Sequence, residues 1–62
     1  MDMPQVGDVW RINRIRRKVT NVTQSLVYYE YDTTPGQVFS LHPKWFTQES
    51  KLVERDGKAV GK

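Results

Sequence analysis

The sequence contains no cysteine. A chain without cysteine forms no disulfide framework, no thiolate-bound zinc site and no thiol nucleophile. The fold must therefore be stabilised by side-chain packing and strand pairing alone. Because disulfides are rare in the reducing cytoplasm, the absence is also compatible with a cytoplasmic location, which we expect for this protein.

Long apolar runs are missing as well. No stretch approaches the roughly 18 apolar residues that a membrane span needs, and the first four residues carry neither a basic leader nor an apolar run. We therefore expect no secretion signal, no anchor and no membrane partner. The 62 residues leave no length for a second domain. A chain of this size buries only about 60% of its unfolded surface, so little remains to wall a pocket for a small-molecule substrate.

Side chains for catalysis or metal binding are scarce. His42 is the only histidine, and no carboxylate stands at ligand spacing from it, so the pattern predicts a capping or turn role and no metal site. The seven carboxylates are scattered, no serine lies in a glycine-rich elbow, and the four glycines form no phosphate-binding loop. The sequence therefore predicts a protein that is not an enzyme and uses no cofactor.

Positive charge is present in excess and is concentrated in one segment. The formal net charge is +3, and residues 11–18 hold five of the ten basic residues without an acidic one. The rest of the chain has five basic and seven acidic residues, a balance of −2. The five basic residues of the segment are Arg11, Arg14, Arg16, Arg17 and Lys18. The protein is thus a nearly neutral body with one positive segment.

Strand-forming residues dominate the apolar set: eight Val and three Tyr stand against a single Ala. Apolar and polar residues alternate, which predicts five short strands. We place them at residues 9–12, 16–23, 26–31, 38–41 and 50–54. Val19 and Val22 lie three apart, so the second strand needs a bulge near Thr20 and Asn21 to keep both valines inside.

The same alternation divides the side chains between core and surface. Val27, Tyr29 and Tyr31 share one face of the third strand, and we assign this face to the core. With Val38 also pointing inward, the aromatics expected to point outward are Tyr28 and Phe39.

Proline interrupts the strand pattern after residue 42. Pro43 cannot donate to a strand ladder, which predicts a short helical turn before the last strand. We assign the aromatic residues of this turn, Trp45 and Phe46, to the core together with Trp10. Residues 55–62 have too little apolar content to be held firmly, so we expect a single domain over residues 1–54 followed by a flexible tail.

The runs VGDVWRI, RRKVTNV, LVYYEY, VFSLHPKWF and KLVE resemble the small SH3-like β-barrels of the KOW and Tudor kind. They are similar in particular to short proteins of that build encoded by phages and prophages. The resemblance covers about residues 4–54 and implies an all-β fold, a five-stranded, partly open barrel with one short helical turn before the last strand. Such barrels bind nucleic acids, peptides and other proteins.

The basic segment is the first candidate site. Guanidinium groups at alternate strand positions face one side, at a spacing similar to that of successive phosphates. A phosphate-binding stripe across the first hairpin would consist of Arg11, Arg14, Arg16, Arg17 and Lys18. The alternative is a solvated strand edge that charge protects against edge-to-edge pairing. Five positive charges without a compensating acid are more than the protection of one strand edge requires.

Three aromatic residues are candidate contacts beside this stripe. Exposed rings of Tyr28 and Phe39 would form a stacking platform for unpaired bases, and an exposed Trp45 would anchor a protein interface. The alternative is that each ring is a wall of the core.

The sequence-based hypothesis is a non-enzymatic phage or prophage accessory protein, a monomer or weak dimer, that binds nucleic acid through its basic first hairpin. A rival hypothesis is a protein-interaction module whose arginines bind an acidic host or phage protein. A third is a homodimeric structural domain formed by strand addition at the open edge of the barrel. Arginine binds phosphate and carboxylate alike, so the sequence leaves these alternatives open.

Overall fold

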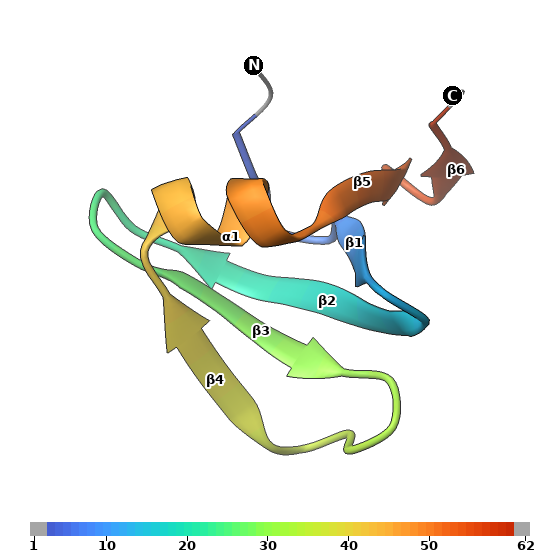
Figure 1. Ribbon diagram of the computed structural model, residues 1–62, viewed down its shortest axis with the longest axis horizontal. Coiled ribbons are helices and arrows are strands. Elements are labelled where there is room, and N and C mark those ends of the chain that lie inside the picture. Colours follow the sequence, from blue (N-terminus) through green and yellow to red (C-terminus); the bar gives the residue numbers. More distant parts are fainter. Residues whose placement is uncertain (1–2, 61–62) are drawn as a thin grey trace.

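The structure is a computed structural model that describes residues 3–60. These residues form one antiparallel sheet with the strand order β4-β3-β2-β1-β5-β6 and one short helix, α1 (Figure 1). The elements are β1 (Val9–Ile12), β2 (Ile15–Val22), β3 (Val27–Tyr31), β4 (Val38–Leu41), α1 (Pro43–Glu49), β5 (Lys51–Arg55) and β6 (Lys58–Ala59). The prediction of a mostly β protein is confirmed.

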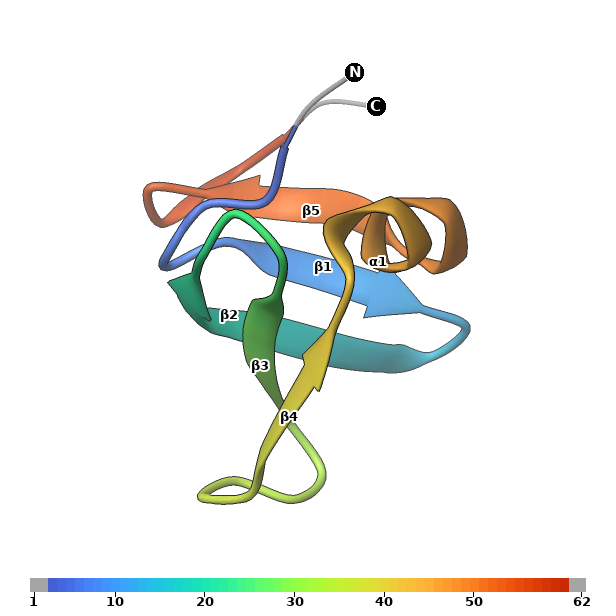
Figure 2. The ribbon, with the colours of Figure 1, turned by 90° about the vertical axis from the view of Figure 1, so that its left-hand side faces the viewer.

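The strand β2 is the longest and joins the two parts of the sheet. It pairs with β1 on one side and with β3 on the other, and its register shifts between Val19 and Asn21. The bulge expected near Thr20 and Asn21 is therefore confirmed. In Figure 2, β3 and β4 run steeply across the direction of β1 and β5. The sheet bends in this way around a core that α1 covers.

The orientation of β4 differs from the prediction. Phe39 lies opposite Tyr29 and Leu41 lies opposite Val27. Because directly opposed residues share a face of the sheet, Phe39 and Leu41 pack against the core, while Val38 is 53% exposed. The assignment of Val38 to the inside and Phe39 to the outside is wrong, since the pairing with β3 shifts the inward positions by one residue.

The helix α1 begins where proline favours it, and it is longer than the single turn expected. His42 is the N-cap, and its Nδ1 accepts a hydrogen bond from the backbone N–H of Lys44 at 3.1 Å. Phe46 is fully buried, but Trp45 is 51% exposed. Consecutive helical residues point about 100° apart, so only one of the two can face the sheet. The assignment of Trp45 to the core is wrong.

The core is small and aromatic. Its buried members are Trp10, Val19, Val27, Tyr29 and Phe46. The ring of Phe46 lies 5.4 Å from that of Trp10, edge to face, and 5.3 Å from that of Tyr29. Phe46 is therefore the aromatic side chain through which the helix packs against the sheet, and Pro43 of the same helix is also buried.

The C-terminal segment adds a strand that the sequence analysis did not predict. Asp56 and Gly57 both have positive φ, 56° and 75°, and turn the chain so that β6 pairs with β5. Two positive φ values in a two-residue Asp-Gly loop are typical of a type I′ hairpin, a signal present in the sequence. Residues 3–60 thus form six strands rather than the five predicted. Residues 61–62 of the expected tail lie outside the described residues.

Candidate nucleic-acid interface

The pairing of three strands places three basic residues side by side. Arg11 of β1 lies directly opposite Arg16 of β2 and directly opposite Lys51 of β5. All three are exposed. We call these three residues the basic row. Because Trp10 points into the core, its neighbour Arg11 lies on the outer face of the sheet, and the in-register partners of Arg11 lie on the same face.

Two further basic residues extend the row to a wider surface. Lys18 lies two positions after Arg16 on the same face of β2, and Arg14 lies in the tight turn between β1 and β2. We call the basic row together with Arg14 and Lys18 the basic face. Four of its residues come from the predicted stripe, and Lys51 joins them from a segment 40 positions away from Arg11.

Three acidic residues lie beside this charge: Glu30 directly opposite Lys18, Asp32, whose Oδ1 accepts from the backbone N–H of Arg16 at 3.4 Å, and Glu54. Arg16 Nη1 lies 3.5 Å from Glu54 Oε2, with the two side chains 57% and 37% exposed, so the pair is weak. The other members of the basic face form no hydrogen bond or ion pair through their side chains with any residue from 3 to 60: Arg11, Arg14, Lys18 and Lys51. Their charge is available to an external anion.

Arg17 is not part of this surface. It is 3% exposed, and its guanidinium carbon lies 4.7 Å from the ring centre of Tyr29 and 5.4 Å from that of Phe46. Its Nη2 donates to Tyr31 Oη and to Glu49 Oε1, each at 3.2 Å. The prediction of an exposed, phosphate-binding Arg17 is therefore corrected: the side chain is stacked inside the protein.

The alternation of β2 explains why Arg17 is buried. Val19 is a core residue, and Arg17 lies two positions before it, so both side chains point to the inner face. Stacking of the planar guanidinium on aromatic rings offsets part of the cost of burying the charge. Nε and Nη1 of Arg17 are buried without a hydrogen-bond partner within residues 3–60. The two-residue spacing between Arg17 and Val19 was the sequence signal that could have predicted the burial of Arg17.

The three candidate aromatics are not brought together. Tyr28 is half-buried on the outer face, opposite Asn21 and Ser40, and Phe39 packs against the core. Trp45 is exposed on α1, where Nζ of Lys44 lies 5.6 Å from its ring centre. Because Phe39 packs against the core and Tyr28 lies on the outer face, the two rings do not form the predicted stacking platform.

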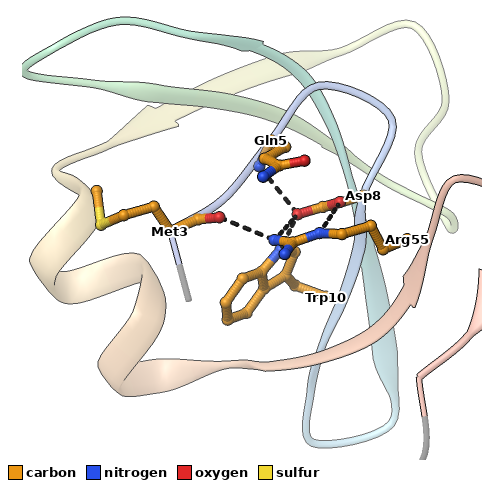
Figure 3. Close-up of polar contacts among 5 residues, drawn as sticks. All are labelled: Met3, Gln5, Asp8, Trp10 and Arg55. Atoms are coloured by element: carbon orange, nitrogen blue, oxygen red, sulfur yellow. Dashed lines mark hydrogen bonds and ion pairs between the residues drawn. The ribbon is translucent and has the colours of Figure 1, made fainter. Parts of the chain in front are cut away.

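A buried carboxylate lies beside the core (Figure 3). Asp8 is 1% exposed and accepts hydrogen bonds from Nε and Nη2 of Arg55 at 3.0 and 2.9 Å. It also accepts from Nε1 of Trp10 at 3.1 Å and from the backbone N–H of Gln5 at 2.9 Å. Arg55 Nη2 also donates to the carbonyl of Met3 at 2.9 Å. The cluster links the N-terminal segment to the end of β5.

The electrostatics of this cluster favour the ionised carboxylate. Burial by itself raises the pKa of Asp8, but the hydrogen bonds from Arg55 and the other donors lower it by more, so the pKa lies below its ordinary value. Every oxygen of Asp8 is engaged within the fold. The cluster therefore has a structural role, and the sequence analysis, which treated the seven carboxylates as scattered, missed it.

An open pocket of about 410 Å³ lies beside the start of α1. It is lined by Met3, Gln24, His42, Pro43, Lys44, Thr47 and Gln48. No carboxylate is among these residues, and Lys44 is the only residue of permanent charge. The pocket lies on α1, whereas the basic row lies on the outer face of the sheet.

Searches of protein-family models, curated proteins and solved structures each found no match to this chain. Within residues 3–60, no three His, Asp or Glu side chains are placed to hold a metal ion. Among the same residues no helix has the length and apolar character needed to cross a membrane.

Proposed function

We propose that this protein is a small, non-enzymatic binding module that contacts nucleic acid through its basic face. The observation that carries the proposal is the basic row, in which Arg11 stands between Arg16 and Lys51 on three neighbouring strands. Like charges directly opposite each other destabilise a sheet. A polyanion bound across the row would relieve this repulsion, and phosphates accept charge-assisted hydrogen bonds from guanidinium and ammonium groups.

The architecture supports a module of the SH3-like kind. The first five strands follow the order β4-β3-β2-β1-β5, α1 lies between β4 and β5, and β2 pairs with both parts of the bent sheet. On these grounds we propose that the bent sheet is a small, partly open barrel of the kind that the sequence resemblance implies. We propose that the protein is a phage- or prophage-type accessory protein acting in the cytoplasm, in keeping with the lack of cysteine.

A second candidate function is binding to an acidic protein. The observation in its favour is Trp45, which is half exposed beside Lys44 and therefore has the character of an interface anchor. A pull-down from nuclease-treated host lysate should then recover one stoichiometric acidic protein, and Trp45→Ala should abolish the recovery. Recovery that depends on intact nucleic acid would instead favour the first function.

The salt dependence of binding tests the first function. Each neutralised phosphate of duplex DNA contributes about −0.9 to the slope of log affinity against log salt. Replacing two arginines of the basic row, Arg11→Gln and Arg16→Gln, should flatten the slope by about two units and weaken binding. Fluorescence anisotropy with labelled oligonucleotides over a salt series measures this.

The matched control removes two positive charges elsewhere. Lys44→Gln lies on α1 and Lys58→Gln lies on β6, so this double variant has the same net charge as the test variant. We expect it to retain most of the affinity and of the salt slope. Equal losses in the two variants would mean that binding depends on net charge alone, and the proposal would fail. Absence of binding at low salt would also refute it.

A further inference from the structure

The hairpin between β1 and β2 extends beyond the rest of the sheet. β5 begins with Lys51 opposite Arg11, and the last backbone contact from the other side is the N–H of Asp32 to the carbonyl of Arg16 at 2.9 Å. Ile12 and Ile15 therefore pair only with each other. In Figures 1 and 2 the turn between β1 and β2 lies at the margin of the molecule. We call residues 12–15 the hairpin tip.

The hairpin tip is narrow and carries one free cation. Asn13 adopts a positive φ of 55° and closes the turn, and the exposed Arg14 side chain contacts no other residue within 3–60 through a hydrogen bond or ion pair. Two paired strands lie about 4.8 Å apart. A two-stranded ribbon of this width enters the major groove of B-form DNA, which is about 12 Å wide.

The basic row lies directly behind the hairpin tip. The Arg11–Arg16 pair is one position from the Ile12–Ile15 pair, or about 3.3 Å along the strands. With Lys51 on the next strand, the row spans about 10 Å across the sheet. When the tip enters a groove, these three cations reach the level of the phosphates that border it. Arg14, at the end of the tip, then faces base edges.

The arrangement of aromatic rings disfavours single-stranded ligands. Proteins that bind single strands without sequence preference stack the bases on exposed aromatic side chains beside a basic groove. Here Phe39 packs against the core and Trp45 lies on α1, while Tyr28 is half-buried opposite Asn21, beyond the bulge in β2. The basic row can bind phosphates but has no adjacent ring on which a base could stack.

Double-stranded RNA is also a poorer fit. Its A-form helix has a deep and narrow major groove that side chains do not enter. We therefore infer, on the basis of the proposed function, that the ligand is duplex DNA, with the hairpin tip in the major groove and the basic row on the flanking phosphates.

Binding to three ligands of equal length tests this inference: duplex DNA, one of its strands alone and duplex RNA. Fluorescence anisotropy at one salt concentration should show duplex DNA bound about tenfold more tightly than either of the others. Equal or tighter binding of the single strand or of duplex RNA would overturn the inference and leave the proposed function standing. If none of the three binds at low salt, the proposed function itself fails.

A substitution at the hairpin tip distinguishes two modes of binding: entry of the tip into the major groove, and contact with the phosphates alone. Arg14→Gln should weaken binding to duplex DNA about fivefold or more, while Lys58→Gln, which removes the same charge on β6, should have a smaller effect. Thermal melting followed by circular dichroism checks that both variants fold. Equal effects of the two variants would refute entry of the tip.

Chemical probing of the major groove gives an independent readout. Guanine N7 lies in the major groove, and dimethyl sulfate methylates it there. Saturating protein should reduce this methylation on duplex DNA, and Arg14→Gln should restore it at equal occupancy. Unchanged methylation at saturation would mean that the protein contacts only the backbone, and the inference would be wrong.

Discussion

Arg16 and Arg17 are neighbours with the same chemistry and opposite surroundings. Arg16 lies on the outer face beside Arg11, and its weak ion pair with Glu54 leaves it largely exposed. Arg17 is stacked on Tyr29 and tied to Glu49 within the fold. A shift of one residue along a strand thus decides whether an arginine lies exposed on the outer face or packs inside the fold. The same contrast recurs on α1 between Trp45, which is exposed, and Phe46, which is buried.

The largest difference in stability is expected between variants of the two neighbouring aromatic residues of α1, Phe46 and Trp45. Phe46→Ala removes the ring that contacts both Trp10 and Tyr29, so it should cost about 3–5 kcal/mol of the free energy of unfolding. That is comparable to the whole stability of a small domain, so the variant should be largely unfolded. Urea titration followed by circular dichroism measures it. Trp45→Ala is the matched control and should cost less than about 1 kcal/mol. Similar losses in both variants would contradict the burial of Phe46 and the exposure of Trp45.

A smaller effect is expected for the two arginines. Arg17→Ala leaves a cavity against the rings and removes the hydrogen bonds to Tyr31 and Glu49, so it should cost about 2–4 kcal/mol, whereas Arg16→Ala should cost less than about 1 kcal/mol.

Arg17→Met sharpens this comparison. It keeps the apolar volume and removes two buried nitrogen atoms without partners, Nε and Nη1. It should therefore be less costly than Arg17→Ala by about 1 kcal/mol or more. Thermal and urea unfolding of the three variants measures the order. If Arg16→Ala is the most destabilising of them, the inner and outer faces of β2 have been exchanged.

A third comparison concerns Asp8 and depends on pH. Because its pKa is lowered in the folded protein, Asp8 contributes stability that is complete above its unfolded pKa, near 3.8. This contribution is lost as the pH falls through the folded pKa. Asp8→Asn should lower stability at neutral pH and flatten the decline below about pH 4.

Urea unfolding at pH 7, 5 and 3 measures this decline. The control, Asp56→Asn, removes a carboxylate from an exposed turn without removing a buried hydrogen bond. It should keep the steep loss of stability in acid. Parallel pH profiles for the two variants would exclude Asp8 as the source of the acid sensitivity.

Much of the secondary structure could be predicted from the sequence. The alternation of apolar residues located the first five strands, the three-residue spacing of Val19 and Val22 indicated the bulge, and Pro43 marked the start of the helix. These signals are local, since each depends on backbone geometry within a few residues. The Asp-Gly turn before β6 was an equally local signal that the prediction did not use.

The candidate site was only partly predictable for the same reason. The charge of residues 11–18 pointed to β1 and β2, but Lys51 joins Arg11 only through the pairing of β1 with β5. The bond between Asp8 and Arg55 likewise joins residues 47 positions apart. No local pattern reports which distant strand becomes a neighbour, because that is decided by the packing of the whole chain.

By itself the sequence determined a mostly β domain without disulfides, with a concentrated positive segment and with strands at defined places. A period of two divides each strand into two faces but does not state which face is inside. The tertiary structure decided this through strand register and through the cover of α1, which placed Phe39 inside and Val38 outside. It also buried Arg17 among aromatic rings and left Arg16 in the basic row, because only the inner face of β2 packs against Phe46.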